Sequence, residues 1–159
     1  MTYNRNRHVE LLKRSQDFKN QEKSLSQKSR NEYLELSKYE GAIQSYIYWE
    51  SRRQFAFLMK KFVTGIIDGQ EFSDSFHVLR QKLIDKCDEF IVELDSEKLK
   101  DFNPDVRSTG FGSFISFLRA ECDNFSEDYQ NEEFYNSIKD CFLKLRKVLD
   151  EELDITEER

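Results

Sequence analysis

The sequence has few of the residues that make tight turns, with only five glycines and one proline among 159 residues. A sandwich or barrel of many short strands needs such residues at its turns, whereas long helices need few of them. These scarcities favour an all-α fold before any pattern is considered. Three cysteines without a C-x-x-C pair argue against a disulfide framework and against a zinc site. We expect Cys87, Cys122 and Cys141 to be reduced and buried.

Long apolar runs are missing as well. The most apolar stretch, residues 55–67, is interrupted by Lys60 and Lys61, and it is far shorter than the roughly 20 residues of a membrane-spanning helix. The N-terminus lacks the uninterrupted apolar core and the small-residue cleavage site of a secretory signal. We therefore expect no membrane segment, and a protein that stays in the compartment where it is made.

Aromatic residues and an uneven charge distribution are what the sequence does have. Fourteen phenylalanines, seven tyrosines and one tryptophan offer ample surface for a core, although 35% of the residues are charged. Up to residue 61 there are 13 lysines and arginines against 7 acidic residues, and after it 12 against 24. Only Phe18 of the phenylalanines precedes residue 55. We predict a basic N-terminal extension over residues 1–43, an acidic helical domain over 44–153 and an acidic tail over 154–159.

The middle of the extension is too polar to close a core. Phe18 and Leu25 are the only large apolar residues between positions 15 and 31. We expect this stretch to be flexible or a marginal helix, and His8 to lie in a loose N-terminus. The extension should then be separable from the acidic domain.

Apolar periodicity predicts the helices of the acidic domain. Apolar residues recur at three- and four-residue steps from Glu32 to Phe62, which predicts a helix with a weak point at Gly41 and an end at Gly65. A second apolar stripe predicts a helix over residues 72–94.

The second half of the domain contains the longest predicted loop, residues 95–110, because Pro104 cannot continue a helix. The next helix is expected to begin at Ser113, or earlier at Ser108 or Thr109. The last helix is expected to begin near Asn131, with two glutamates in its first turn where the helix dipole favours them. Four amphipathic helices predict an antiparallel four-helix bundle. Its expected core is Phe62, Phe72, Phe76, Leu83, Phe90, Phe114, Phe117, Phe142 and Leu145.

An acidic stretch is the candidate partner-binding site. Six carboxylates lie between residues 121 and 133 with no lysine or arginine among them, and aromatic side chains accompany them. Such a cluster at a turn between helices can steer a basic partner, whereas solvated helix ends are the plainer explanation. The predicted site is Glu121, Asp123, Glu127, Asp128, Tyr129, Glu132 and Glu133, with Phe125 beside it.

Catalytic, metal and cofactor sites are not predicted. An EF-hand needs a central glycine and alternating oxygen ligands, and the stretch DNFSEDYQNEEF has neither. His77 lies off the apolar stripe of its helix and is expected to be a partly exposed histidine rather than a catalytic base. The basic residues of the extension could touch nucleic acid or an acidic surface, and a solubilising tail is the alternative. They are Arg5, Arg7, Lys13, Arg14, Lys19, Lys23, Lys28 and Arg30.

Residues 57–149 carry a resemblance to a known family. The run FLMKKFVTGIIDGQEFSDSFHVLRQKL resembles the opening of the colicin D type of immunity protein, and the later FISFLRAECDNF and NEEFYNSIKDCFLKL are similar to its closing half. The resemblance implies a four-helix bundle that masks a basic, RNA-cleaving toxin domain, with acidic side chains in the place of substrate phosphates. The matching positions of the first run are Phe62, Gly65, Ile66, Glu71, Phe72 and Phe76.

The same region also resembles uncharacterised open reading frames of green-algal chloroplast genomes, so the expected location is a bacterial cytoplasm or a plastid stroma. Three hypotheses follow. The first is a non-enzymatic acidic protein that binds a basic protein domain, in the manner of an immunity protein. The second is an accessory protein of an organellar complex, and the third is a nucleic-acid-processing enzyme. The oligomeric state is left open.

Overall fold

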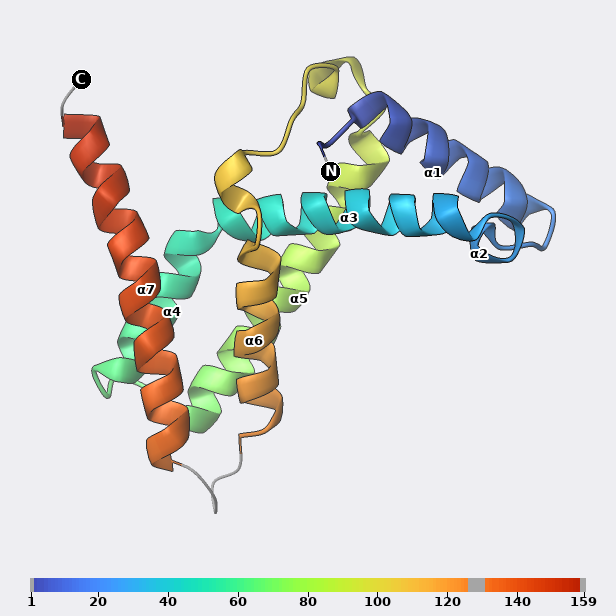
Figure 1. Ribbon diagram of the computed structural model, residues 1–159. Helices are drawn as coiled ribbons and strands as arrows, with labels where there is room; N and C mark the ends of the chain where they lie inside the picture. The colour runs from blue at the N-terminus through green and yellow to red at the C-terminus, as the bar shows by residue number, and fades with distance from the viewer. Residues whose placement is uncertain (1, 126–130, 158–159) are drawn as a thin grey trace. The chain divides into compact units, whose positions relative to one another are not determined.

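The computed structural model describes residues 2–125 and 131–157, with side chains up to residue 125 and from 132 to 151 (Figure 1). Within these residues the chain forms helices and no strand, which confirms the all-α class. None of these helices is long and apolar enough to cross a membrane. The elements are α1 (Arg5–Asn20), α2 (Leu25–Lys28), α3 (Arg30–Glu50), α4 (Arg52–Val63), α5 (Gly69–Glu93), the 3-10 turns η1 (Glu97–Leu99) and η2 (Val106–Ser108), α6 (Phe111–Asp123) and α7 (Asn131–Glu157).

The chain divides into two compact units, each built from two separated stretches. Unit 1 comprises Met1–Ile47 and Ile84–Gly112, and unit 2 comprises Tyr48–Leu83 and Ser113–Arg159. The predicted extension of residues 1–43 therefore lies in one unit with a stretch from the middle of the chain.

The N-terminal region of unit 1 has a core of its own. Leu11, Leu25, Leu36 and Tyr39 are buried together, and Tyr3, Leu12 and Phe18 pack against them. Of the two alternatives expected for residues 15–31, the helical one fits most of the stretch, because α1 continues to Asn20 and a reciprocal capping box between Ser24 and Gln27 begins α2. The expectation that this stretch is too polar to take part in a core is wrong, because Leu25 is buried and Phe18 packs against the same core. The few apolar residues there are enough because α3 supplies the rest of the core.

The helix expected from Glu32 to Phe62 is interrupted at Ser51 rather than at Gly41. Helix α3 runs through Gly41, where a Cβ would meet no atom within 4 Å. Ser51 is buried and separates α3 from α4. Helix α4 ends at Val63 and is closed by Gly65, as expected: Gly65 has a φ of 73°, and the N–H groups of Gly65 and Ile66 donate to the carbonyls of Phe62 and Lys61. This is a Schellman motif, which requires the left-handed conformation that glycine adopts freely.

Helices α5, α6 and α7 begin close to the expected positions. Asp68 and Glu71 cap α5 reciprocally, because the backbone N–H of each residue donates to the other's carboxylate at 3.1 and 2.9 Å. Helix α6 begins at Phe111, between the alternatives that the sequence left open. Helix α7 begins at Asn131.

The expected core is correct in part. Phe62, Phe72, Phe76, Leu83 and Leu145 are buried, and Phe90, Phe114 and Phe142 are half-buried. Phe117 is 48% exposed, so its assignment to the core is wrong. The buried face of α6 is instead Phe111, Ile115, Leu118 and Cys122, at helical spacings of four, three and four residues. Phe117 is two residues from Ile115 and therefore on the opposite side of the helix.

Candidate functional site

Unit 2 has two hollows beside the C-terminal end of α6 and the N-terminal end of α7. These two helix ends contain part of the predicted acidic stretch. The last turn of α6 is followed by Asn124 and Phe125, whose N–H groups donate to the carbonyls of Ala120 and Cys122. These bonds continue the helical path by two residues, and the Phe125 ring lies against Phe134 near the start of α7. Both hollows are lined by Phe125 and by Phe134 of α7.

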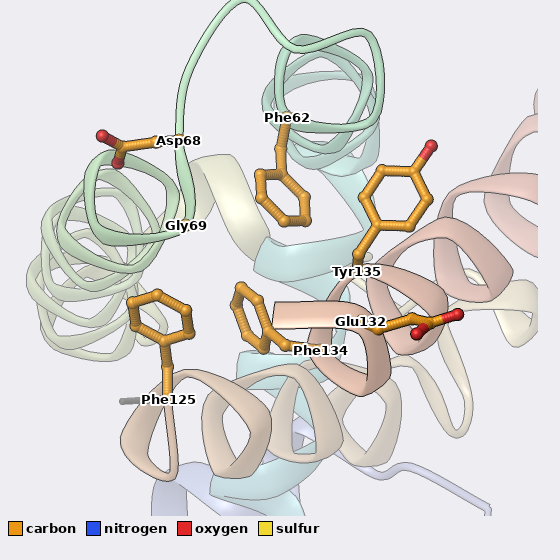
Figure 2. Close-up of a pocket in the computed structure, with 7 residues that line it drawn as sticks. All are labelled: Phe62, Asp68, Gly69, Phe125, Glu132, Phe134 and Tyr135. Carbon is orange, nitrogen blue, oxygen red and sulfur yellow. The ribbon is translucent and has the colours of Figure 1, made fainter. Parts of the chain in front are cut away.

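The first hollow, which we name the aromatic pocket, has a volume of about 450 Å³ (Figure 2). The rings of Phe125 and Phe134 lie 4.7 Å apart, and the ring of Phe62 lies 5.4 Å from that of Phe134. Figure 2 shows the carboxylates of Asp68 and Glu132 turned away from these rings. The interior is thus suited to an apolar side chain. The lining is Phe62, Asp68, Gly69, Phe125, Glu132, Phe134 and Tyr135.

Two contacts set the shape of the aromatic pocket. The hydroxyl of Tyr135 donates to the carbonyl of Val63 at 3.2 Å, which ties the first turn of α7 to the end of α4. The ring of Phe125 lies against the backbone of Gly69, so close that a Cβ on that glycine would be 2.6 Å from the ring. Glycine at position 69 is therefore what allows Phe125 to approach α5.

The second hollow, which we name the acidic groove, has a volume of about 690 Å³. Three carboxylates, two amides and a hydroxyl line it above the rings of Phe125 and Phe134. No lysine or arginine belongs to the described lining. The lining is Glu121, Asn124, Phe125, Glu133, Phe134, Asn136, Ser137 and Asp140.

The predicted site residues are divided between these hollows and the surrounding surface. Glu121 and Glu133 line the acidic groove, and Glu132 lines the aromatic pocket. Asp123 lines neither hollow. The predicted residues Glu127, Asp128 and Tyr129 lie outside the described residues.

The negative charge of Asp123 is partly offset by neighbouring side chains. Its carboxylate lies 3.1 Å from Nε of Arg119 and 3.4 Å from Nε2 of His77. The expectation of an uncompensated acidic stretch is therefore wrong at this residue, because Arg119 precedes the stretch by two residues yet is one helical turn from Asp123. His77 is partly exposed, as expected.

Sequence reasoning missed the part of the acidic groove that α7 supplies. Asn136, Ser137 and Asp140 follow Glu133 at intervals of three, four and seven residues, which places all four on one face of a helix. Following the face of the last helix beyond residue 133 would have identified them.

Four of the eight basic residues named in the N-terminal region pair with groups of unit 1. Lys13 pairs with Asp95 at 2.7 Å, and the side chain of Arg5 donates to the carbonyls of Leu94 and Ser96 at 3.0 and 3.2 Å. Arg7 donates to both oxygens of Glu35, and Arg14 pairs with Glu32. The Arg7 guanidinium lowers the pKa of Glu35, and Lys13 lowers the pKa of Asp95. A dispersed positive tail is therefore the wrong description of these four cations.

His8 is buried, and its expected place in a loose N-terminus is wrong. Asn4 caps α1, and the imidazole is stacked on the ring of Tyr39 at 5.4 Å. The hydroxyl of Tyr3 lies 3.1 Å from Nδ1, while Nε2 is buried without a hydrogen-bond partner in the described part of the chain. Burial lowers the pKa of His8 to about 4.

The cysteines are free and buried, as expected. Burial raises the pKa of Cys87 and Cys141 to about 11 and that of Cys122 to about 12, which leaves all three as unreactive thiols at neutral pH. Among the residues that the structure describes, no cluster of histidine, cysteine and acidic side chains could hold a metal ion.

The resemblance to immunity proteins stays a prediction, because it rests on sequence pattern alone. Comparisons of this chain with models of protein families, with curated proteins and with solved structures find no match.

Proposed function

We propose that this chain is a non-enzymatic binding protein, and that its acidic groove and aromatic pocket together receive a basic segment of a partner protein. The observation that carries the proposal is the acidic groove, in which Glu121, Glu133 and Asp140 converge without a cation in the described lining. Carboxylates gathered in one hollow raise the local concentration of a positively charged partner and speed its encounter.

The polar and apolar parts of the two hollows suit different side chains of the same segment. The carboxylates and amide oxygens of the acidic groove can accept hydrogen bonds from lysine or arginine. The aromatic pocket next to it offers Phe62, Phe125 and Phe134 to an apolar residue. A partner segment with basic residues beside a large apolar residue would fill both, and the apolar anchor would supply most of the specificity.

The partner class favoured by the resemblance is a basic, RNA-cleaving domain that the chain masks. Unit 2 contains four helical stretches, from α4, α5, α6 and α7, which would serve as the four-helix bundle of this proposal. The carboxylates of the acidic groove would then occupy the place of RNA phosphates. A gene for such a domain directly beside the gene for this chain would support masking, whereas neighbours that encode photosynthesis or ribosomal proteins would favour an accessory role.

The test uses the double variant Glu133→Gln/Asp140→Asn, which removes two charges and keeps side-chain size. A fluorescein-labelled peptide rich in lysine and arginine, with one phenylalanine, is the probe. We expect binding at low salt to weaken by about 5- to 10-fold, since exposed pairs contribute up to about 1 kcal/mol each. At about 1 M salt, where screening acts over about 3 Å, the difference should nearly vanish.

The matched control is Glu50→Gln/Asp74→Asn, which removes the same two charge types from exposed positions of unit 2 outside both hollows. The control should bind the peptide within about 2-fold of the parent. Equal weakening in both double variants would mean that the peptide responds only to net charge, and the proposed site would be wrong.

A further inference from the structure

We propose that a second groove of unit 2, between α4 and α7, binds an acidic amphipathic helix of another protein. This basic groove has a volume of about 460 Å³ and shares no lining residue with the acidic groove or the aromatic pocket. The residues that carry the argument are Arg53, Phe57 and Lys60 of α4 and Phe142, Arg146 and Leu149 of α7.

The floor of the basic groove is apolar and open to solvent. Phe57 is 61% exposed, an unusual exposure for phenylalanine on a chain whose other rings mostly pack in cores. Phe142 and Leu149 are seven residues apart on α7, which places them on one face and about 10 Å apart along the helix. An apolar strip of about this length between two helices is the geometry that receives the apolar face of a third helix.

Cations border this strip on both helices. Arg53 and Lys60 are exposed, lie seven residues apart on α4, and form no ion pair with any residue that the structure describes. Asp150 also lines the groove and lies 3.5 Å from Arg146, so these two charges offset each other and the net positive charge of the groove comes from Arg53 and Lys60. The Nζ of Lys61 lies 4.8 Å from the centre of the Phe57 ring and adds a fourth cation.

Charge complementarity therefore defines the occupant. A positive groove on a chain of net charge −6 selects carboxylates, and its apolar floor selects leucine- or phenylalanine-like side chains between them. An acidic amphipathic helix carries both. A nucleic acid would satisfy the cations but would leave Phe142 and Leu149 without apolar partners, and Lys61 already covers one face of Phe57.

The probe for this proposal is a synthetic, fluorescein-labelled helical peptide with leucines on one face and glutamates along its flanks. The double variant Arg53→Glu/Lys60→Glu should weaken binding at low salt by about 10-fold or more. The control Lys82→Glu/Lys144→Glu changes the net charge equally at exposed positions outside the groove, and it should bind within about 2-fold of the parent. Both variants change only exposed side chains and should keep the parent's helical circular dichroism.

Phe57→Ser tests the apolar part separately. Because the ring is mostly exposed, this variant should remain folded and should bind the peptide about 5-fold more weakly, with a loss that persists at about 1 M salt. Glu133→Gln/Asp140→Asn should leave this binding unchanged, which keeps the basic groove distinguishable from the acidic one.

Several results would overturn the proposal. One is a parent that does not bind the peptide, and another is equal binding by the groove and control variants. A third is binding of a single-stranded oligonucleotide, but not of the peptide, that is lost in Arg53→Glu/Lys60→Glu, because the occupant would then be nucleic acid. A fourth is a dimer in sedimentation that only Arg53→Glu/Lys60→Glu dissociates, because the occupant would then be a second copy of the chain.

Discussion

Among single residues, His8 has the most specific environment. Its ring is fully buried between Tyr3 and Tyr39, and Nε2 has no described partner, so the site accepts only the neutral imidazole. The pKa in the folded chain is about 4, against an ordinary value of 6.5. Above pH 6.5 neither the folded nor the unfolded chain binds this proton. Below it the unfolded chain does, so stability falls as the pH drops from about 6.5 to about 4.

The prediction is that His8 lowers the free energy of unfolding by about 3 kcal/mol as the pH falls through this interval, because its pKa differs by about 2.5 between the unfolded and folded chain. Urea unfolding at pH 7 and pH 4.5 measures it. His8→Phe keeps a ring of similar size and should show a smaller pH dependence than the parent. An unchanged pH dependence in His8→Phe would contradict the assignment.

Gly69 matters through its neighbour Phe125. Alanine in the first turn of a helix is ordinarily favourable by up to about 1 kcal/mol over glycine. Here its Cβ would lie 2.6 Å from the Phe125 ring, which must move. We predict that Gly69→Ala destabilises the parent by about 1 kcal/mol but stabilises a Phe125→Ala background by about 0.5 kcal/mol. A double-mutant cycle in urea measures this coupling, and additive effects would mean that the two residues do not touch.

At the scale of elements, α1 shows how a polar segment becomes structural. Leu11 is fully buried against residues of α2 and α3. The side chain of Arg5 donates hydrogen bonds to the carbonyls of Leu94 and Ser96, which follow α5. We predict that Leu11→Ala lowers the free energy of unfolding by about 2–4 kcal/mol. Leu34→Ala, at a position that is nearly half exposed, should cost less than about 1 kcal/mol. Similar small effects in both variants would show that the N-terminal region is separable after all.

Helix α6 provides a pair of adjacent residues that differ in burial. Leu118 is fully buried and Phe117 is 48% exposed. We predict a loss of about 2–4 kcal/mol for Leu118→Ala and less than about 1 kcal/mol for Phe117→Ala, although phenylalanine is the larger side chain. Thermal or urea unfolding of the two variants measures this. The reverse order would mean that α6 is rotated from the orientation described above.

At the scale of the whole molecule, both units are assembled from separated stretches of chain. The fragment 44–153 contains both stretches of unit 2 to residue 153, but of unit 1 it retains little more than residues 84–112. We predict that unit 2 stays folded in this fragment while residues 84–112 lose protection, because the contacts of Arg5, Lys13 and the Tyr3 ring with this stretch are gone. Amide hydrogen exchange measures this by segment. Unchanged protection of residues 84–112 would contradict the division into these two units.

The candidate site was predictable only where its residues are close in sequence. Glu121, Glu132 and Glu133 were identified because acidic residues gather between positions 121 and 133. Phe62 and Gly69, which shape the aromatic pocket, are about 60 residues earlier in the chain and have no local feature that connects them with α6 and α7. The pairing of Arg7 with Glu35 also has no local signal in the sequence. Cations that look dispersed along the sequence can therefore form ion pairs within unit 1.

The sequence by itself determined the helical class, the closure of α4 by Gly65 and the start of α7, because helix periods and helix ends depend on residues within one turn of each other. Only the tertiary structure decided that Leu118 rather than Phe117 is buried, that His8 is enclosed, and that the polar N-terminal helices belong to a core. These outcomes depend on the partner that covers each face. Such partners lie far away in sequence, and helix periodicity does not specify them.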